Sequence, residues 1–441
     1  MRSRAKRLVR LSLQWLATPY PVDGTSEEQR AGMQMLWWDN LLAAMSVAFF
    51  MDFETLYLLA MGAPSSTIGA RASIVAAAAL LAPLVGAWLV SVSGRRKIWV
   101  LLNGGGIGRV TLLLSALAPL LFPRPQSAIL FVVILAALRS FAGSVTMPPF
   151  NSLFADLVPP PLRGRVMGIR MMASSAITVI IVPIAGYLIK AIGGLRGYQV
   201  TLVLATVIGA AATYFFSRIP EIQGEESARQ PASAFIQGLR MLRSDRGFLV
   251  FCAINFVWTL GTQTSAPYFS VHMVENLGFG VDTIALLTTI VTVFNVIAVR
   301  LAGTLVDRKG AERLTMIGML LVPLMPVAWI FAHSPAQVAL ARIYGVFAWA
   351  GVQVAATPLI LQIAPRRYTA QYVAIFNTII GVAAVLGPLP AAWLYAHYGF
   401  TTNLVISALI RGLGAGLFLI ACLRGFFRRP APAESSQTLA V

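Results

Sequence analysis

The chain has 441 residues, of which 58% are hydrophobic and 11% are charged, whereas soluble domains carry about a quarter charged residues. That composition excludes a soluble globule, because too little polar surface is available to cover one. The formal net charge of +18 is distributed in short clusters between long apolar runs, which excludes the single basic face of a nucleic-acid-binding module. We therefore expect the lipid bilayer, and no nucleic acid, as the partner of this chain.

Apolar segments of membrane-spanning length recur along the whole chain. A bilayer core of ~30 Å needs about 20 apolar residues per helix, because every backbone N–H and C=O must be paired inside the segment. Twelve segments meet this requirement: 36–60, 68–91, 98–121, 127–151, 166–190, 197–218, 247–270, 281–302, 314–332, 336–360, 371–395 and 402–423. The sequence predicts an all-α integral membrane protein with twelve transmembrane helices, a multi-pass protein of the cell (plasma) membrane.

The one long polar break, residues 219–246, divides the spans into six and six. It predicts a first six-helix bundle over 36–218 and a second over 247–424, joined by a cytoplasmic linker. Residues 1–35 and 425–441 are expected to be a cytoplasmic N-terminal segment and a cytoplasmic tail. Both termini are placed inside because most of the 34 Lys and Arg lie in these segments and in the loops on the same side, and cytoplasmic loops retain basic residues.

The first span carries two acids in its outer half, where an ionisable side chain is costly unless it is paired or reaches water. Asp52 and Glu54 are two residues apart and hence roughly 200° apart on a helix, so both can face one cavity only if the helix unwinds there. We pair one of them with Arg139, near the middle of span 4. In the alternative, one acid contacts water at the outer interface and Arg139 only orients its helix. Asp39 and Asn40 are expected at the membrane interface.

Other cations have less defined roles. Arg109 and Arg411 lie deep in spans 3 and 12, where either domain stability or substrate contact fits. Arg71 is counted with the few basic residues of the outer side, and Arg170 with those of the cytoplasmic side.

The two halves repeat each other at similar offsets. Arg139 with Gly143 in span 4 matches Arg342 with Gly345 in span 10. The loop after span 8 contains Gly303, Asp307, Arg308, Gly310 and Arg313, and the loop after span 2 contains Gly94, Arg95 and Arg96, with Ser91 and Val92 where the other copy has an acid and a base. Pro183 and Gly186 in span 5 likewise match Pro388 and Ala391 in span 11. Such duplication is typical of transporters built around a site at the bilayer midplane.

On these motifs the chain resembles the major facilitator superfamily of transporters over residues 35–425. The resemblance implies two six-helix bundles that rock about a central cavity, with an embedded acid of span 1 serving proton coupling. Asp52, Glu54 and Arg139 are thus the coupling candidates. It also implies that the two loops form a cytoplasmic gate, in which Arg95 or Arg96 pairs with Asp156 at the inner end of span 4. The altered first loop is expected to weaken that half of the gate.

Spans 1, 4, 7 and 10 enclose the substrate in this family, which indicates a set of polar cavity candidates. Asn255, Trp258 and Thr262 recur at helical spacing on span 7, next to Gln263. Gln353 in span 10 and Asn377 in span 11 complete the set. The alternative for each of them is an interhelical hydrogen bond.

The expected function is secondary active transport of a small organic solute by alternating access, with protons as the coupling ion and the chain as a monomer. No nucleotide-binding signature and no clustered catalytic side chains are visible, so we expect neither an ATP-driven pump nor an enzyme, and no cofactor or metal. Buried arginines favour an organic anion, whereas the span 1 acids and apolar walls favour an amphipathic drug-like cation. Two alternatives stay open: a transport-inactive sensor or assembly scaffold on the same fold, and a facilitated-diffusion uniporter.

Overall fold

The computed structural model describes Tyr20 and residues 25–221, 245–365 and 368–427, and every regular element in these parts is a helix. The first half contains α2 (Glu27–Ala48), α3 (Glu54–Ala60), α4 (Ser65–Ser93), α5 (Arg96–Val100), a π-helix (Leu101–Ile107), α6 (Gly108–Leu121), α7 (Pro125–Leu157), a short 3-10 turn (Pro160–Leu162), α8 (Arg163–Ile192) and α9 (Gly194–Ser217). The second contains α11 (Arg246–Ser265), α12 (Tyr268–Glu275), α13 (Val281–Lys309), α14 (Ala311–Leu321), α15 (Leu324–Ile330), α16 (Pro335–Ile363), α17 (Thr369–Leu386) and α18 (Pro388–Leu423). Most of the predicted linker, and parts of both terminal segments, lie outside the described residues.

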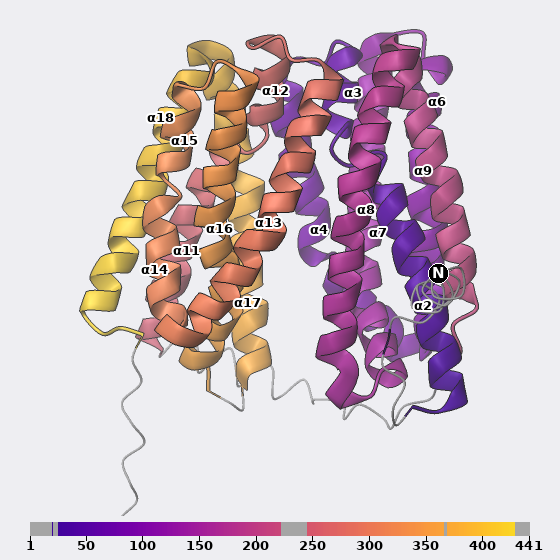
Figure 1. Ribbon diagram of the computed structural model, residues 1–441, viewed down its shortest axis with the longest axis horizontal. Helices are drawn as coiled ribbons and strands as arrows, with labels where there is room; N and C mark the ends of the chain where they lie inside the picture. Colours follow the sequence, from indigo (N-terminus) through magenta and orange to yellow (C-terminus); the bar gives the residue numbers. More distant parts are fainter. Residues whose placement is uncertain (1–19, 21–24, 222–244, 366–367, 428–441) are drawn as a thin grey trace, which may run out of the picture.

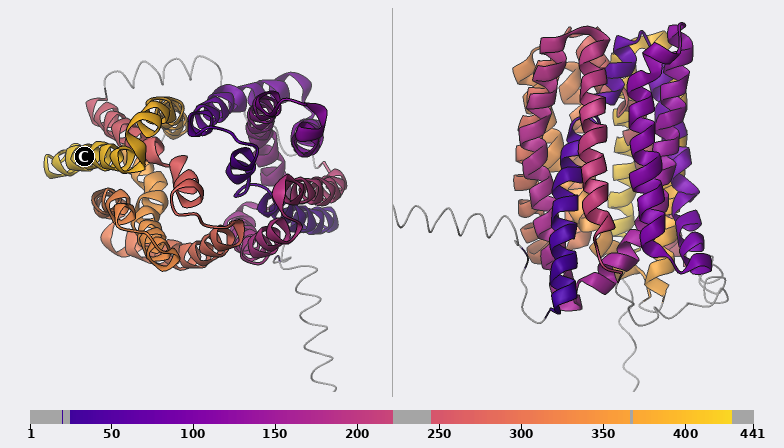
Figure 2. Two further views of the ribbon diagram at one scale, coloured as in Figure 1. Left: turned by 90° about the horizontal axis from the view of Figure 1, so that it is seen from above. Right: turned by 90° about the vertical axis from the view of Figure 1, so that its right-hand side faces the viewer.

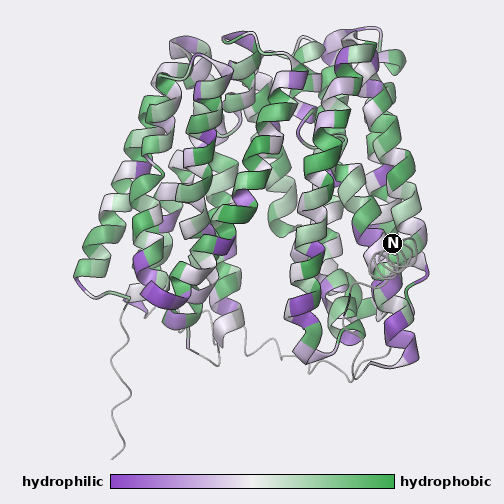
Figure 3. Ribbon diagram, in the orientation of Figure 1, coloured by the Kyte–Doolittle hydropathy of each residue, from purple (hydrophilic) through white to green (hydrophobic). Residues whose placement is uncertain are grey.

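The helices form two groups that stand side by side. Helices α2–α9 occupy one side of the molecule and α11–α18 the other, both in the side view and from above (Figures 1 and 2). Most residues along the helix lengths are hydrophobic, and hydrophilic residues gather toward the ends of the helices (Figure 3). Ten helical stretches in the described part are long and apolar enough to cross a membrane, and the longest, residues 371–423, contains most of α17 and all of α18.

The first predicted span is not one helix. A capping box between Ser26 and Gln29 starts α2 nine residues earlier than expected. The helix ends at Ala48, and a turn over 49–53 separates it from α3. The predicted helix over 36–60 is therefore wrong in its continuity. Asp39 and Asn40 consequently lie in the middle of α2, not at its start.

The two groups meet at the end of the molecule where α3 and α12 lie, which we call the closed end; the opposite end, where α4 and α13 finish, is the linker end (Figure 1). Helix α4 packs against α17 and α18, α8 against α13, and α3 against α12. A Cβ on Gly186 of α8 would collide with the Ala285 methyl of α13, so glycine permits this close approach. Lys190 and Asp282 form an ion pair of 2.8 Å between the same two helices.

Candidate functional site

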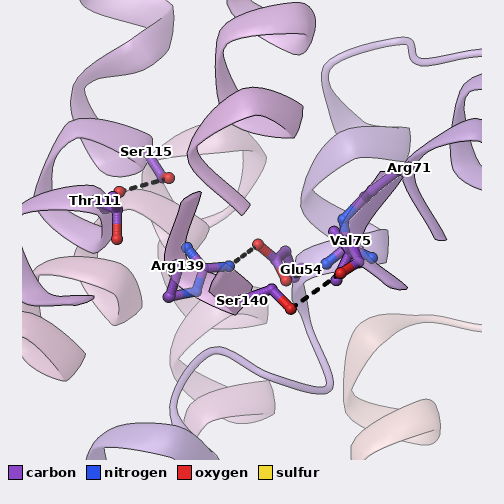
Figure 4. A network of polar contacts seen from close by, with 7 residues as sticks. All are labelled: Glu54, Arg71, Val75, Thr111, Ser115, Arg139 and Ser140. Carbon is purple, nitrogen blue, oxygen red and sulfur yellow. Dashed lines mark hydrogen bonds and ion pairs between the residues drawn. The ribbon is translucent and has the colours of Figure 1, made fainter. Parts of the chain in front are cut away.

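A buried acid lies between two arginines inside the first half. The Glu54 carboxylate, at the first position of α3, forms ion pairs with Arg139 of α7 and Arg71 of α4 (Figure 4). Glu54 is 9% exposed, and the Arg139 guanidinium also lies 5.1 Å from the centre of the Phe50 ring. Because a buried charge is tolerated when it is paired and hydrogen-bonded, these contacts account for an acid at this depth.

The expected contact between a span 1 acid and Arg139 thus involves Glu54, and sequence analysis missed its second partner. Arg71 was assigned to the outer side, but it lies within α4, one helical turn and a half after Ser65. Its side chain points back across the bundle to Glu54 (Figure 4). One feature of the sequence could have indicated that two arginines share one acid: the first half has only a few acids within its spans but several arginines.

Asp52 lies in the turn between α2 and α3, and its side chain is exposed. It forms no ion pair among the described residues, yet it lies within electrostatic range of Arg342 on α16, in the other half. The two acids therefore have different surroundings: Glu54 is paired inside the first half, and Asp52 interacts with the second. The predicted first helix is interrupted at these two acids, which is where the sequence analysis required it to unwind if both acids were to face one cavity.

A cavity of about 760 Å³ lies in the second half. Five of the six predicted cavity residues line it: Asn255, Trp258, Thr262, Gln263 and Gln353. Asn377 does not belong to the lining and is exposed on α17. The residues that α17 contributes are Phe376 and Ile380, which are one turn apart and define the face of that helix toward the cavity.

Aromatic rings form much of the cavity wall. Trp258 of α11 and Trp349 of α16 stack with their ring centres 5.1 Å apart, and Trp329 and Phe269 contact each other at 4.6 Å. Among the polar lining residues, the Asn255 amide donates to a backbone carbonyl one turn earlier in α11. The wall thus offers flat apolar surfaces, with polar groups that are partly engaged by their own helix.

Two arginines, Arg342 and Arg411, are the charged residues of the cavity lining, which contains no acid. Arg411 is 3% exposed and donates to the carbonyls of Gly261 and Thr262, both at 3.3 Å, and to the Ser265 hydroxyl at 2.6 Å. It therefore holds α18 against α11. Among the described residues, Arg342 makes only two long hydrogen bonds, of 3.4 Å each, to one hydroxyl of α13.

Polar groups also cluster on α2. The Asn40 amide donates to the Arg170 carbonyl at 3.2 Å and to Ser174 at 3.3 Å, and the Arg170 guanidinium donates to Asn40 Oδ1 at 3.2 Å. Arg109 of α6 donates to Ser46 at 3.2 Å. These contacts stay within the first half and join α2 to α6 and α8.

The first predicted gate loop contains an ion pair. Arg96, at the start of α5, pairs with Asp156 near the end of α7, whereas Arg95 is exposed. Gly94 ends α4 with a φ of 67°, a conformation that glycine adopts without strain. The altered copy of the motif thus contributes a direct contact between two helices.

The second gate loop, with the intact motif, is more open. Asp307, Arg308 and Arg313 are exposed and form no ion pair within the described ranges. Gly310 ends α13 with a φ of 83°, and Gly303 has no atom within 4 Å of where a Cβ would lie. In this conformation, the ion pair expected of the gate motif is found at Arg96 and Asp156 in the first half, although the intact copy of the motif is in the second half.

Comparisons with known proteins place these features in a family. The sequence model of the Major Facilitator Superfamily matches residues 37–269 and 255–440. The multidrug resistance protein MdtG of Salmonella paratyphi C is 23% identical over 320 residues, covering 71% of this chain and 75% of that protein. MdtG of Klebsiella pneumoniae is 24% identical over 351 residues, covering 78% and 79%.

Solved transporters share the fold at lower identity. The nucleoside transporter NupG superimposes with a TM-score of 0.69 at 13% identity, covering 92% of this chain and 100% of that one. A bacterial homologue of the human lysosomal transporter Spinster, inward-facing and unoccupied, gives 0.70 at 14%, covering 93% and 100%. A D-xylose–proton symporter gives 0.65 at 17%, covering 88% and 95%.

Proposed function

Because the chain belongs to the Major Facilitator Superfamily, whose members transport solutes across membranes, we propose that it is a proton-coupled secondary transporter of a small organic solute. It is a multi-pass protein of the plasma membrane. The observation that carries the proposal is the break in the first helix, which leaves Asp52 exposed and within electrostatic range of Arg342 in the cavity lining of the other half. A sensor or scaffold would not need this arrangement.

The proposed topology has twelve crossings. The 53-residue stretch 371–423 would be about 80 Å long at 1.5 Å per residue, far more than a ~30 Å bilayer core, so it counts as two spans. Helices α2 and α3 supply one further span. With the basic residues retained inside, both termini and the linker face the cytoplasm, and the linker end is the inner face of the membrane.

In this orientation the contacts at the closed end seal the outer side, and the conformation is the inward-facing one of an alternating-access cycle. The two units that move are the bundles of residues 36–218 and 247–424. The gate contacts at the linker end, including those of Asp307 and Arg308, would then form in the opposite conformation. This interpretation accounts for the exposure of both residues in this structure.

Asp52 is the better candidate for the proton carrier. Protonating Glu54 would leave two largely buried guanidinium groups without a counter-ion, and breaking a buried pair in this way costs about 3–5 kcal/mol. Asp52 is exposed and has no direct ion pair among the described residues, so it can exchange a proton without that cost. Glu54 with Arg139 and Arg71 would then position α3 and the turn before it.

Transport by the purified chain in proteoliposomes tests the proposal. Uptake of a pooled panel of organic anions, neutral compounds and amines is measured by mass spectrometry, with and without an imposed pH gradient. We expect the gradient to accelerate uptake of at least one solute, and Asp52→Asn to abolish the acceleration while exchange continues. Arg196→Gln, a change in an exposed residue of α9, is the control. Solute flux of the same rate with and without the pH gradient would identify a uniporter. No flux of any solute would favour a scaffold.

A further inference from the structure

We propose that the solute is an organic anion with a flat aromatic body, and that its anionic group binds Arg342 in competition with the Asp52 carboxylate. The inference rests on the proposed function, because it names the class of substrate for the same cavity. It chooses between the two classes, organic anion and amphipathic cation, that the sequence alone left open.

The balance of charge around the cavity is positive. The lining contains two arginines and no acid. Of the two acids in the outer half of the first span, Glu54 already forms ion pairs with Arg71 and Arg139. Its negative charge is therefore compensated and would not attract a cationic solute. Asp52 lies within electrostatic range of one lining arginine, Arg342. A cation in this space would be repelled, whereas an anion would compensate a charge that is costly inside a membrane.

Arg342, and not Arg411, has the capacity to bind the anion. The Arg411 guanidinium donates to three acceptors of α11 and is almost fully buried. Within the part of the chain that the structure describes, the Arg342 guanidinium has only the two 3.4 Å hydrogen bonds to the Thr288 hydroxyl. A guanidinium with free N–H groups binds a carboxylate through two parallel hydrogen bonds. Arg342 is therefore the site for the anionic group.

The position of Trp349 on α16, the helix that carries Arg342, predicts an aromatic group in the ligand. Trp349 follows Arg342 by seven residues on α16, which places the two side chains on nearly the same face and about 10 Å apart along the axis. The stacked pair of Trp349 and Trp258 offers a flat surface at that distance. A cavity of about 760 Å³ is within the usual range for drug-sized ligands. The ligand should thus have an anionic group at one end and a ring system at the other.

Competition between Asp52 and the ligand explains how the proton and the solute are coupled. While Asp52 is ionised, it compensates Arg342 and disfavours the anion. Once Asp52 binds a proton, Arg342 is free for the ligand, so proton and anion bind together and the net charge of the site is unchanged. This order predicts symport of the two, with tighter binding of the anion at lower pH.

Other ionisable groups lie on the helices packed against α3. The helices packed against α3 are α4, α9 and α12. Arg196 of α9 is exposed. The other ionisable groups of these helices have the following contacts: Arg71 with Glu54, Tyr198 with the Tyr57 ring, Tyr214 with Arg218, His272 with the Phe400 ring, Tyr268 with the Tyr395 ring, and Glu275 with the Tyr395 hydroxyl. Arg342 is the charged group that acts on Asp52.

Calorimetric titration of the purified full chain with three ring-matched probes tests the inference. The probes are 2-naphthoate, 2-naphthamide and 2-naphthylmethylammonium, which differ in charge and share the ring. We expect naphthoate to bind most tightly. Arg342→Gln should weaken its binding by at least about tenfold, the effect of losing a charged hydrogen bond, and Arg342→Lys should weaken it less. Arg196→Gln, an exposed change on α9, should leave it unchanged.

Asp52→Asn provides a second, independent readout. Naphthoate stays ionised at both pH 5.5 and pH 7.5, so any pH dependence of its binding comes from the protein. Wild-type chain should bind it more tightly at pH 5.5, and Asp52→Asn should bind equally tightly at both values. This result keeps the inference testable even if Arg342→Gln fails to fold.

Three results would overturn the inference: tighter binding of the ammonium probe, no binding of any probe, or naphthoate binding that neither Arg342 variant affects. Because the titration is done at equilibrium without a membrane gradient, its outcome is separate from that of the proposed function. Gradient-driven flux of an amine without naphthoate binding contradicts only the substrate class. Naphthoate binding without gradient-driven flux contradicts only the coupled transport.

Discussion

Arg139 in the middle of α7 donates to the carboxylate of Glu54 at the start of α3, 85 residues earlier in the chain. Arg71 of α4 donates to the other oxygen of the same carboxylate. One acid therefore joins three helices of the first half. It also fixes the turn before α3, which carries Asp52 toward the other half.

Replacing the shared acid should destabilise the first half strongly. Glu54→Gln leaves two largely buried guanidinium groups without a counter-ion, and we expect a loss of about 3–5 kcal/mol in the free energy of unfolding. Arg71→Gln should cost less, because Glu54 keeps Arg139. Thermal unfolding in detergent measures both. Equal melting temperatures for wild type and Glu54→Gln would contradict the structural role of the acid.

The two neighbouring arginines of the first gate loop should respond differently. Arg96→Gln removes the partly buried pair with Asp156 and should cost about 1.5–3 kcal/mol, as for other hydrogen bonds to charged groups. Arg95→Gln changes an exposed side chain of the same type and serves as the matched control. A chain in which both variants melt at the same temperature as wild type would show that the loop charges determine topology alone.

A larger side chain at the closest approach of the halves should open the closed end. Gly186→Leu would push α8 away from Ala285 of α13. In a chain with Lys190→Cys and Asp282→Cys, a short thiol crosslinker should join the halves efficiently, and the added Gly186→Leu change should lower the yield several-fold. Gly168→Leu, on the same helix but with no neighbour within 4 Å of its Cβ position, is the control. An unchanged yield with Gly186→Leu would mean that this contact does not hold the end closed.

The polar cluster on α2 should contribute stability. Asn40→Leu leaves the Arg170 guanidinium without the acceptor that it has in the first half, and an unsatisfied buried polar group costs about 1–3 kcal/mol, or more when it is charged. Asn40→Asp, which retains an acceptor oxygen at this position, should recover part of the loss. Thermal unfolding of the two variants decides the point: if Asn40→Leu is as stable as wild type, Arg170 has another partner.

The helices were predictable because length and hydropathy determine them. Each predicted segment overlaps a helix of the described part, but four of them contain a break. Segments 247–270, 314–332 and 371–395 are interrupted at Pro267, Pro323 and Gly387, and segment 36–60 is interrupted after α2. Residues 49–53 contain neither glycine nor proline, the usual signals for a break. The only sign was the presence of two acids that one continuous helix could not direct to the same cavity.

Side-chain partners were less predictable than helices. Asn255, Trp258 and Thr262 could be placed on the cavity because they repeat on one face of α11 amid apolar residues. Trp329 and Trp349 are apolar residues among other apolar residues, so the sequence pattern did not single them out as cavity residues. Arg71 was missed because a charge near a span end looks the same whether it contacts water or a buried acid.

The central claim is that the two halves open alternately at their two ends, and paired distance measurements test it most directly. Spin labels at Arg124 and His333 report on the closed end, and labels at Arg95 and Arg308 report on the linker end; all four positions are exposed. On lowering the pH in the presence of 2-naphthoate, we predict a new population in which the Arg95–Arg308 distance is shorter and the Arg124–His333 distance is longer. Distances that stay fixed at both ends, or that change in the same direction, would contradict the account.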